Sequence, residues 1–151
     1  MTFDGKFWLR MGIGLAAAAG GYVIWASRHK MFVNDVTTGE SSAYPSLRSR
    51  VYYADVPQAA AAAEQALSRL PRWKLVQHDS ENGVLEAEVR TRVGPFTDDV
   101  TVYFFPLGRG QTRVTIRSRS RLGRGDLGQN AHHIRELQAA MDARLNTDAA
   151  F

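Results

Sequence analysis

The hydrophobic pattern of the chain begins with an apolar segment of membrane-helix length. Residues 8–27, WLRMGIGLAAAAGGYVIWAS, contain a single charged side chain, Arg10, which lies near the start of the segment. A helix rises about 1.5 Å per residue, so about 20 apolar residues cross the hydrocarbon core of a bilayer. Trp8 and Trp25 stand near its two ends, as is typical at membrane interfaces. We therefore expect residues 1–30 to form an N-terminal tail and a transmembrane anchor.

Small residues give this segment a smooth surface on which a second membrane helix can pack closely. Its glycines are Gly12, Gly14, Gly20 and Gly21. Because glycine and alanine are also common in membrane helices in general, helix packing and simple membrane composition both explain them.

A cleaved signal peptide is the main alternative to an anchor. Lys6 and Arg10 form a basic start, and the alanine run offers cleavage sites. Apolar residues nevertheless continue through residues 22–25, where a cleavage region should become small and polar. Arg28 and Lys30 follow the segment, so the distribution of positive charge discriminates only weakly between orientations. We expect a single-pass protein of the cell inner membrane with its soluble domain in the periplasm.

Four later segments alternate apolar and polar residues with a period of two. They are residues 73–78, 84–93, 98–105 and 111–122. In the last segment, Val114 and Ile116 point to one side while Arg113 and Arg117 point to the other. Alternation of this kind predicts an antiparallel sheet with one buried and one polar face.

Two segments have helical periodicity. The first follows a short strand at residues 51–54 and runs through an alanine-rich stretch to about Leu70, with Asp55 as its cap. The second has Asp126 as its predicted cap and an apolar stripe that continues to about Leu145. Both helices are expected to pack on the apolar side of the sheet.

These patterns define the expected fold and domains. Residues 31–50 are rich in Ser, Thr, Gly and Pro, and we expect them to form an irregular lead-in. Residues 51–151 then form one soluble domain. The predicted fold class is α+β, with an N-terminal transmembrane helix followed by a four- or five-stranded antiparallel sheet and two helices packed on one face.

Matching the apolar faces of neighbouring strands also predicts ion pairs on the polar face. It places Asp99 opposite Arg117 on one neighbour and opposite Arg90 on the other. Each such cross-strand pair contributes about 0.2–1 kcal/mol. We therefore assign these three residues a structural role.

Composition and charge exclude several classes of function. The net charge is +4 and the isoelectric point about 9.8, but residues 31–151 hold 15 basic and 14 acidic residues. The basic excess therefore flanks the apolar segment, where anionic headgroups favour it, and no nucleic-acid partner is expected. The absence of cysteine excludes thiolate metal sites. His132 and His133 are adjacent, so on a helix they project about 100° apart and do not share a metal; neither a metal nor a cofactor is expected.

One motif resembles a known family. The pattern R-S-x-S-R-x-G-x-x-D-x-G-x-N occurs at residues 117–130, and NDVTTGE occurs at residues 34–40. Together with Asp98 in the sequence DDV, these residues are similar to the bacterial and plastid family called domain of unknown function 1499. The resemblance implies a fold and an envelope or membrane setting, but no activity. Where the family often has an acidic residue and an arginine, this chain has Thr115 and His133.

The motif has two physical interpretations. Its glycines and capping residues suit a tight turn between a strand and a helix. Alternatively, free amides at the helix start and nearby arginines would form an anion-binding or interaction site. The candidate residues are Arg117, Arg119, Arg121, Gly123, Asp126, Gly128 and Asn130.

No catalytic constellation stands out, so the expected function is not enzymatic. We expect a membrane-anchored accessory subunit that contacts membrane lipid and docks onto an integral-membrane protein complex, photosynthetic or respiratory. An envelope domain that binds a lipid or another small apolar ligand is the first alternative. A hydrolase using Asp98, Arg117 and Asp126 is the second, and it requires these three side chains to converge in a cleft.

Overall fold

The computed structural model describes residues 33–92, 94–123, 126–145 and 147–148. The predicted anchor, with its four glycines, lies outside the described residues. Among the helices within them, none is both long and apolar enough to cross a bilayer.

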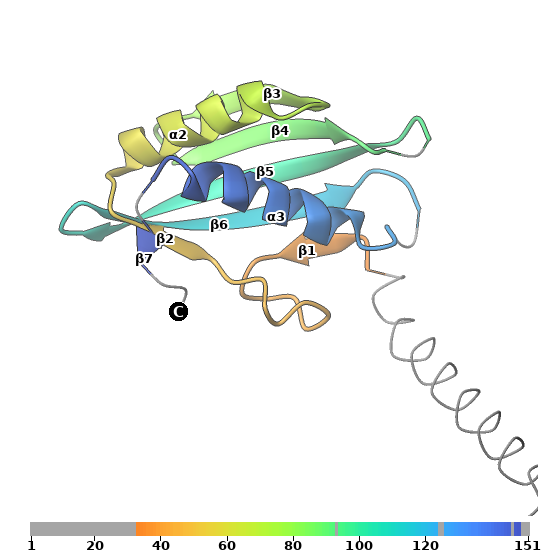
Figure 1. Cartoon of the computed structure of the whole chain (residues 1–151), viewed down its shortest axis with the longest axis horizontal. Coiled ribbons are helices and arrows are strands. Elements are labelled where there is room, and N and C mark those ends of the chain that lie inside the picture. Colours follow the sequence, from red (N-terminus) through yellow and green to blue (C-terminus); the bar gives the residue numbers. More distant parts are fainter. Residues whose placement is uncertain (1–32, 93, 124–125, 146, 149–151) are drawn as a thin grey trace, which may run out of the picture.

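The fold is α+β: an antiparallel sheet with two helices packed on one face (Figure 1). The helices are α2 (Val56–Arg69) and α3 (Gln129–Asp142). The strands are β1 (Asp35–Thr37), β2 (Arg50–Tyr52), β3 (Trp73–Asp79), β4 (Val84–Arg90), β5 (Thr97–Gly108), β6 (Gln111–Ser120) and β7 (Thr147–Asp148).

The four predicted long strands form the body of the sheet, and the additional strands are short. The order is β3-β4-β5-β6-β2-β7. Strand β1 pairs with the same edge of β6 as β2 does, but nearer the C-terminal end of β6. The sheet is thus wider than the four or five strands expected. β1 lies within the predicted irregular lead-in because three residues there bond to the edge of β6, a pairing that no local pattern of hydrophobicity specifies.

The alternation of β4, β5 and β6 divides the sheet into two unlike faces, whereas in β3, which has an irregularity between Leu75 and Gln77, only Trp73 is buried. Side chains such as Leu85, Val102 and Ile116 are fully buried beneath the helices. Their neighbours along each strand point to the face that the helices leave uncovered. This arrangement confirms the half-buried sheet predicted from the period-two pattern.

Helix α2 begins where its sequence predicts. Asp55 accepts a hydrogen bond from the amide of Gln58, whose side chain accepts one from the amide of Asp55, so the two residues form a capping box. The buried side of the helix is almost entirely alanine: Ala59, Ala60, Ala62, Ala63 and Ala66, with Leu67. These small side chains let the helix backbone lie close to the sheet.

Helix α3 begins later than predicted. Its N-cap is Gly128, which has a φ of 85° and offers no side chain for capping. Asp126 accepts hydrogen bonds from the amides of Gly128 and Asn130 from a position before the helix. The predicted cap residue therefore does satisfy free amides, but the left-handed conformation of the glycine, which side-chain-bearing residues disfavour, places the helix start at Gln129.

The predicted ladder of ion pairs is wrong in its partners. Asp99 lies opposite Arg119 and Glu88, whereas Arg117 lies opposite Thr101 and Arg90 opposite Thr97. Each register differs from the predicted one by two residues. A shift of two preserves the face of every side chain, so face matching by itself does not distinguish between these registers.

We expect Asp55→Ala to lower the free energy of unfolding by about 1 kcal/mol, because the amide of Gln58 at the start of α2 loses its partner. Thermal unfolding of the full-length chain, followed by circular dichroism, measures the change. Gln65→Ala, at an exposed position of the same helix, is the control and should leave stability unchanged or slightly higher. Equal stability of the Asp55 variant and wild type would contradict the capping role.

Candidate functional site

The family motif at residues 117–130, the signature, begins on β6, and its β6 residues are divided between the two faces of the sheet. Ser118 and Ser120 are buried on the helix side, whereas the arginines between and around them lie on the uncovered side. The motif therefore does not assemble a single site. Its two halves have different surroundings and different chemistry.

The buried half of the signature joins α3 to β6 through one amide side chain. Ser118 Oγ donates to Asn130 Oδ1 at 2.7 Å, and Asn130 Nδ2 donates to Ser120 Oγ at 3.1 Å. The backbone amide of Asn130 donates to the carboxylate of Asp126. Since Asn130 is fully buried, each of these polar groups needs its partner. This geometry favours the structural interpretation of the motif.

A second buried polar contact lies beside it. His133 Nε2 and Asp98 Oδ2 are 3.1 Å apart, and both side chains are almost completely excluded from solvent. The rings of His133 and Trp73 lie nearly perpendicular, with 5.8 Å between their centroids, and the indole nitrogen of Trp73 donates to Glu136 at 2.9 Å. The histidine that departs from the family pattern thus has a defined polar partner. The sequence did not reveal this pair, because 35 residues separate its members.

The helix start does not form the anion cradle that the sequence suggested. The amides of Gly128 and Asn130 are already bonded to Asp126. Arg121 lies on the uncovered face, where it binds Asp99 at 2.6 Å and Glu88 at 2.5 Å. Arg119 is exposed on that same face.

Gly123 and the three predicted hydrolase residues lie in two different parts of the fold. The carbonyl of Gly123 accepts a hydrogen bond from Asn34 Nδ2. Asp98 and Asp126 line one depression at the end of the sheet, but Arg117 lines a groove on the uncovered face. These three predicted hydrolase residues therefore do not converge.

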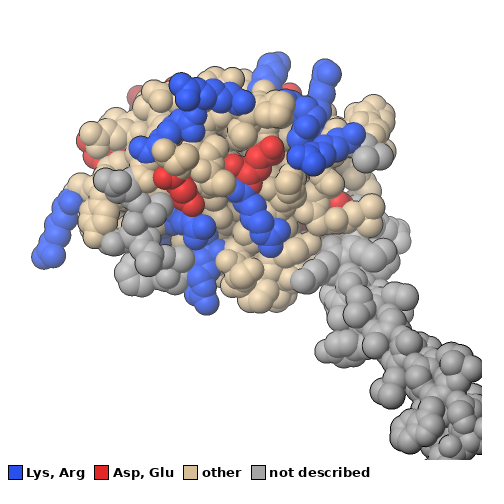
Figure 2. All heavy atoms as spheres, viewed as in Figure 1, with Lys and Arg blue, Asp and Glu red and all other residues tan. Residues whose placement is uncertain are grey.

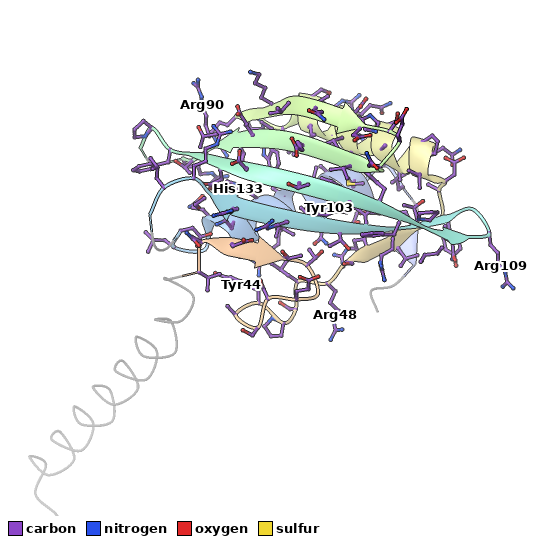
Figure 3. The ribbon with its side chains drawn as sticks, turned by 180° about the vertical axis from the view of Figure 1, so that it is seen from behind. Tyr44, Arg48, Arg90, Tyr103, Arg109 and His133 are labelled. Carbon is purple, nitrogen blue, oxygen red and sulfur yellow. The ribbon has the colours of Figure 1, made fainter. Side chains whose placement is uncertain are left out.

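The uncovered face carries a groove of about 750 Å³. Its floor is formed by outward-pointing residues of β5 and β6, with Tyr103 in the middle of the face (Figure 3). Its wall is formed by residues 37–41, which comprise the last residue of β1 and the turn after it, and by Ser49. The wall includes residues 37–40 of the NDVTTGE segment, and Arg117 of the motif at residues 117–130 lies on the floor, so two of the segments that carry the family resemblance meet here.

Aromatic and guanidinium groups dominate one end of the groove. The rings of Tyr103 and Phe105 are stacked, with 6.4 Å between their centroids and 19° between their planes. The Arg113 guanidinium lies 4.9 Å from the centroid of the Phe105 ring. These three side chains come from paired strands, which hold them in fixed relative positions.

The other end of the groove is fixed by an ion pair with two parallel hydrogen bonds. Arg117 Nε donates to Asp35 Oδ1 at 2.9 Å, and Arg117 Nη2 donates to Asp35 Oδ2 at 2.5 Å. These hydrogen bonds hold the pKa of the Asp35 carboxyl below its ordinary value. The pair fastens β1 and the groove wall to the sheet.

A chain of hydroxyl groups crosses from the wall to the floor. Ser49 Oγ lies 2.9 Å from Thr115 Oγ1 and 3.2 Å from Thr38 Oγ1. No histidine lines the groove in the described part of the chain, and no group of potential metal ligands occurs among the described residues. The groove therefore offers stacking, guanidinium and hydroxyl contacts, which are suited to recognition.

The aromatic residues of β5 are the sequence signal for this groove. Tyr103 and Phe105 occupy positions of their strand that point away from the helices, where polar residues are usual. Two aromatic residues on the exposed face of a sheet indicate a contact surface. The wall had no such signal, because its position depends on the pairing of β1 with the distant strand β6.

We expect Asn130→Ala to lower the free energy of unfolding by about 2–4 kcal/mol, because two buried serine hydroxyls lose their partner and a cavity remains. Urea unfolding of the full-length chain measures the loss. Ala139→Ser, at an exposed position of α3, is the control and should change stability by less than about 0.5 kcal/mol. A similar small effect at both positions would contradict a stabilising role for the hydrogen bonds of Asn130 to Ser118 and Ser120.

The Asp35–Arg117 pair predicts a dependence of stability on pH. Because the pKa of Asp35 is lowered in the fold, its contribution is complete above the unfolded pKa of about 3.9 and disappears as pH falls through the lower folded value. We expect Asp35→Asn to cost up to about 1 kcal/mol at pH 7, a limit set by the partial exposure of the pair. Urea unfolding at pH 7 and pH 3 tests this.

At pH 3 the difference between the Asp35 variant and wild type should shrink. Exchange of the two residues, Asp35→Arg with Arg117→Asp, should recover part of the stability lost in either single variant at pH 7. A loss that is the same at both pH values would contradict an electrostatic origin.

Comparison with known proteins identifies a family for this chain. No protein with a curated description matches the chain. A family model described as "Protein of unknown function (DUF1499)" matches residues 29–141. The match covers well over half of the chain and includes the groove wall, the long strands, the signature on β6 and nearly all of α3. The chain therefore belongs to the DUF1499 family.

Proposed function

We propose that this chain is a non-enzymatic, membrane-anchored accessory subunit that docks onto an integral-membrane protein complex through the groove on its uncovered sheet face. The observation that carries the proposal is the cluster of Tyr103, Phe105 and Arg113 on a face that the helices leave free. An energy-transducing complex of the inner membrane, with the docking domain on the periplasmic side, is the proposed host.

The residue types in the groove support a protein partner. Tyrosine and arginine are enriched among the residues that dominate binding energy at interfaces. Phe105 is 40% exposed, so a partner would remove a large aromatic surface from water. Because paired strands already hold these side chains, binding loses little conformational freedom.

The interior supports docking over enclosure of an apolar ligand. Trp73, Phe104 and Ile116 fill the space between sheet and helices, and all three are buried. A domain that encloses a lipid needs that space for its ligand. The hydrolase alternative loses its geometric basis because Arg117 lies on the opposite face of the sheet from Asp98 and Asp126.

The charge distribution supports a protein partner over nucleic acid. Figure 2 shows acidic side chains interspersed among basic ones on the helix-covered face. On the uncovered face, Arg117 and Arg121 are paired with carboxylates. A nucleic-acid surface would instead need a continuous basic patch.

The membrane part of the proposal is supported by the sequence. Residues 8–27 have the length and composition of a spanning helix. Basic residues flank the segment on both sides, as at a membrane boundary.

The test is the size of the native assembly. Membranes of the source organism are solubilised in mild detergent, and migration of the full-length chain is compared with that of Phe105→Ala with Arg113→Glu. Wild type should migrate with a larger complex, and the variant should lose about tenfold or more of that association, since such residues contribute strongly to binding.

A control makes comparable changes outside the groove, with one apolar residue changed to alanine and one arginine to glutamate. Leu107→Ala with Arg109→Glu alters an exposed apolar side chain and an arginine of the adjoining hairpin, where Arg109 points away from the sheet (Figure 3). This control should remain in the complex. Migration of wild type alone at monomer size, or equal behaviour of both variants, would refute docking through the groove.

A further inference from the structure

One end of the sheet exposes three large apolar side chains. Phe96 is 47% exposed, Leu122 is 69% exposed and Leu127 is 76% exposed. Phe96 belongs to the connection between β4 and β5, and the two leucines belong to the connection between β6 and α3. All three line one depression of about 380 Å³, so they form a single surface. We call these three residues the apolar tip.

The described chain begins at this same end. The backbone amide of Ser120 donates to the carbonyl of Asn34 at 2.9 Å, and Asn34 Nδ2 donates to the carbonyl of Gly123 at 2.9 Å. Asn34 is therefore fastened beside Leu122, at the base of the tip. In Figure 1 the start of β1 and the connection between β6 and α3 lie side by side.

The sequence before Asn34 limits its distance from the apolar segment. Only residues 28–33 separate Ser27, the last residue of that segment, from Asn34. Even a fully extended chain of this length spans no more than about 25 Å. If residues 8–27 cross a bilayer, the apolar tip is within reach of the lipid surface from which the chain emerges.

We propose that the apolar tip docks the domain against the membrane, with Phe96, Leu122 and Leu127 in the interfacial region of the bilayer. This inference rests on the membrane anchoring in the proposed function and deepens it. Single exposed apolar residues are ordinary, but three on one surface beside the membrane-proximal chain have a common explanation. The occupant of this surface is lipid.

Charge near the tip suits a lipid surface. Arg92 is exposed on the same connection as Phe96, and Arg28 and Lys30 follow the apolar segment in the sequence. Basic residues at this position are attracted to anionic headgroups. Aromatic and aliphatic side chains beside them would enter the boundary between headgroups and acyl chains.

Docking by the tip also sets the orientation of the groove. Strands β5 and β6 run from the end that carries the tip to the hairpin at the opposite end (Figure 1). With the tip on the membrane, the uncovered face of the sheet stands upright beside it. The groove then faces sideways, toward a neighbouring protein in the same membrane.

The absence of cysteine allows a direct test. A single cysteine is introduced by Phe96→Cys or Leu127→Cys, and by Leu107→Cys in the hairpin at the opposite end as the matched control. Each full-length variant is labelled with the environment-sensitive fluorophore NBD. It is then reconstituted into phosphatidylcholine–phosphatidylglycerol vesicles, with and without nitroxide-labelled lipid.

We expect the nitroxide lipid to quench the labels at positions 96 and 127 at least about threefold more than the label at position 107. Addition of Leu122→Glu to the Phe96→Cys variant should bring quenching at position 96 close to the value at position 107. Equal quenching at all three positions would overturn the inference. Protection of the tip from aqueous iodide without quenching by nitroxide lipid would also overturn it, because protein would then cover the surface.

Carbonate extraction of the same vesicles separates failure of the inference from failure of the anchor. If the unlabelled chain is released by carbonate, the membrane anchoring in the proposed function is wrong and the inference falls with it. If the chain is retained but the tip is no more quenched than position 107, the anchor stands and tip docking alone is refuted.

Discussion

The buried side chain of Asn130 holds together the two parts of the domain on which everything else depends. It bonds to two serines of β6 while its backbone amide bonds to Asp126. One residue thereby fixes the start of α3 and the position of that helix over the sheet. With α3 in place, the apolar face is covered and the opposite face is free to carry the groove.

The same strand supplies both the interior and the surface of the molecule. Alternate residues of β6 contact α3 or line the groove, so a change that moves the strand affects both faces together. The Asp35–Arg117 pair adds β1 to this arrangement from the uncovered side. The hydrogen bond from Ser118 to Asn130 on the helix side and the ion pair of Arg117 with Asp35 on the uncovered side therefore involve adjacent residues of β6.

The sequence predicted the helices and strands better than the register and contacts between them. Periodicity located the four long strands and both helices because each signal is contained within its own segment, as in the Asp55–Gln58 capping box. Register was missed by two residues because both alternatives place identical faces together. The contact between His133 and Asp98, and the pairing of β1 with β6, depend on residues that meet only in the folded chain. The candidate site followed the same rule: outward aromatics were visible in the sequence, but the wall that makes them a groove was not.

The hairpin between β5 and β6 has a consequence for how this family can vary in length. The pairing of the two strands is regular from Asp98 to Pro106, and an irregularity follows between Pro106 and Gly108. One added residue within the regular part would turn arginines toward the helices and valines toward water. At the bulge an extra residue is absorbed without that inversion. We therefore expect insertions and deletions to be tolerated at the hairpin end rather than in the regularly paired stretch that begins at Asp98.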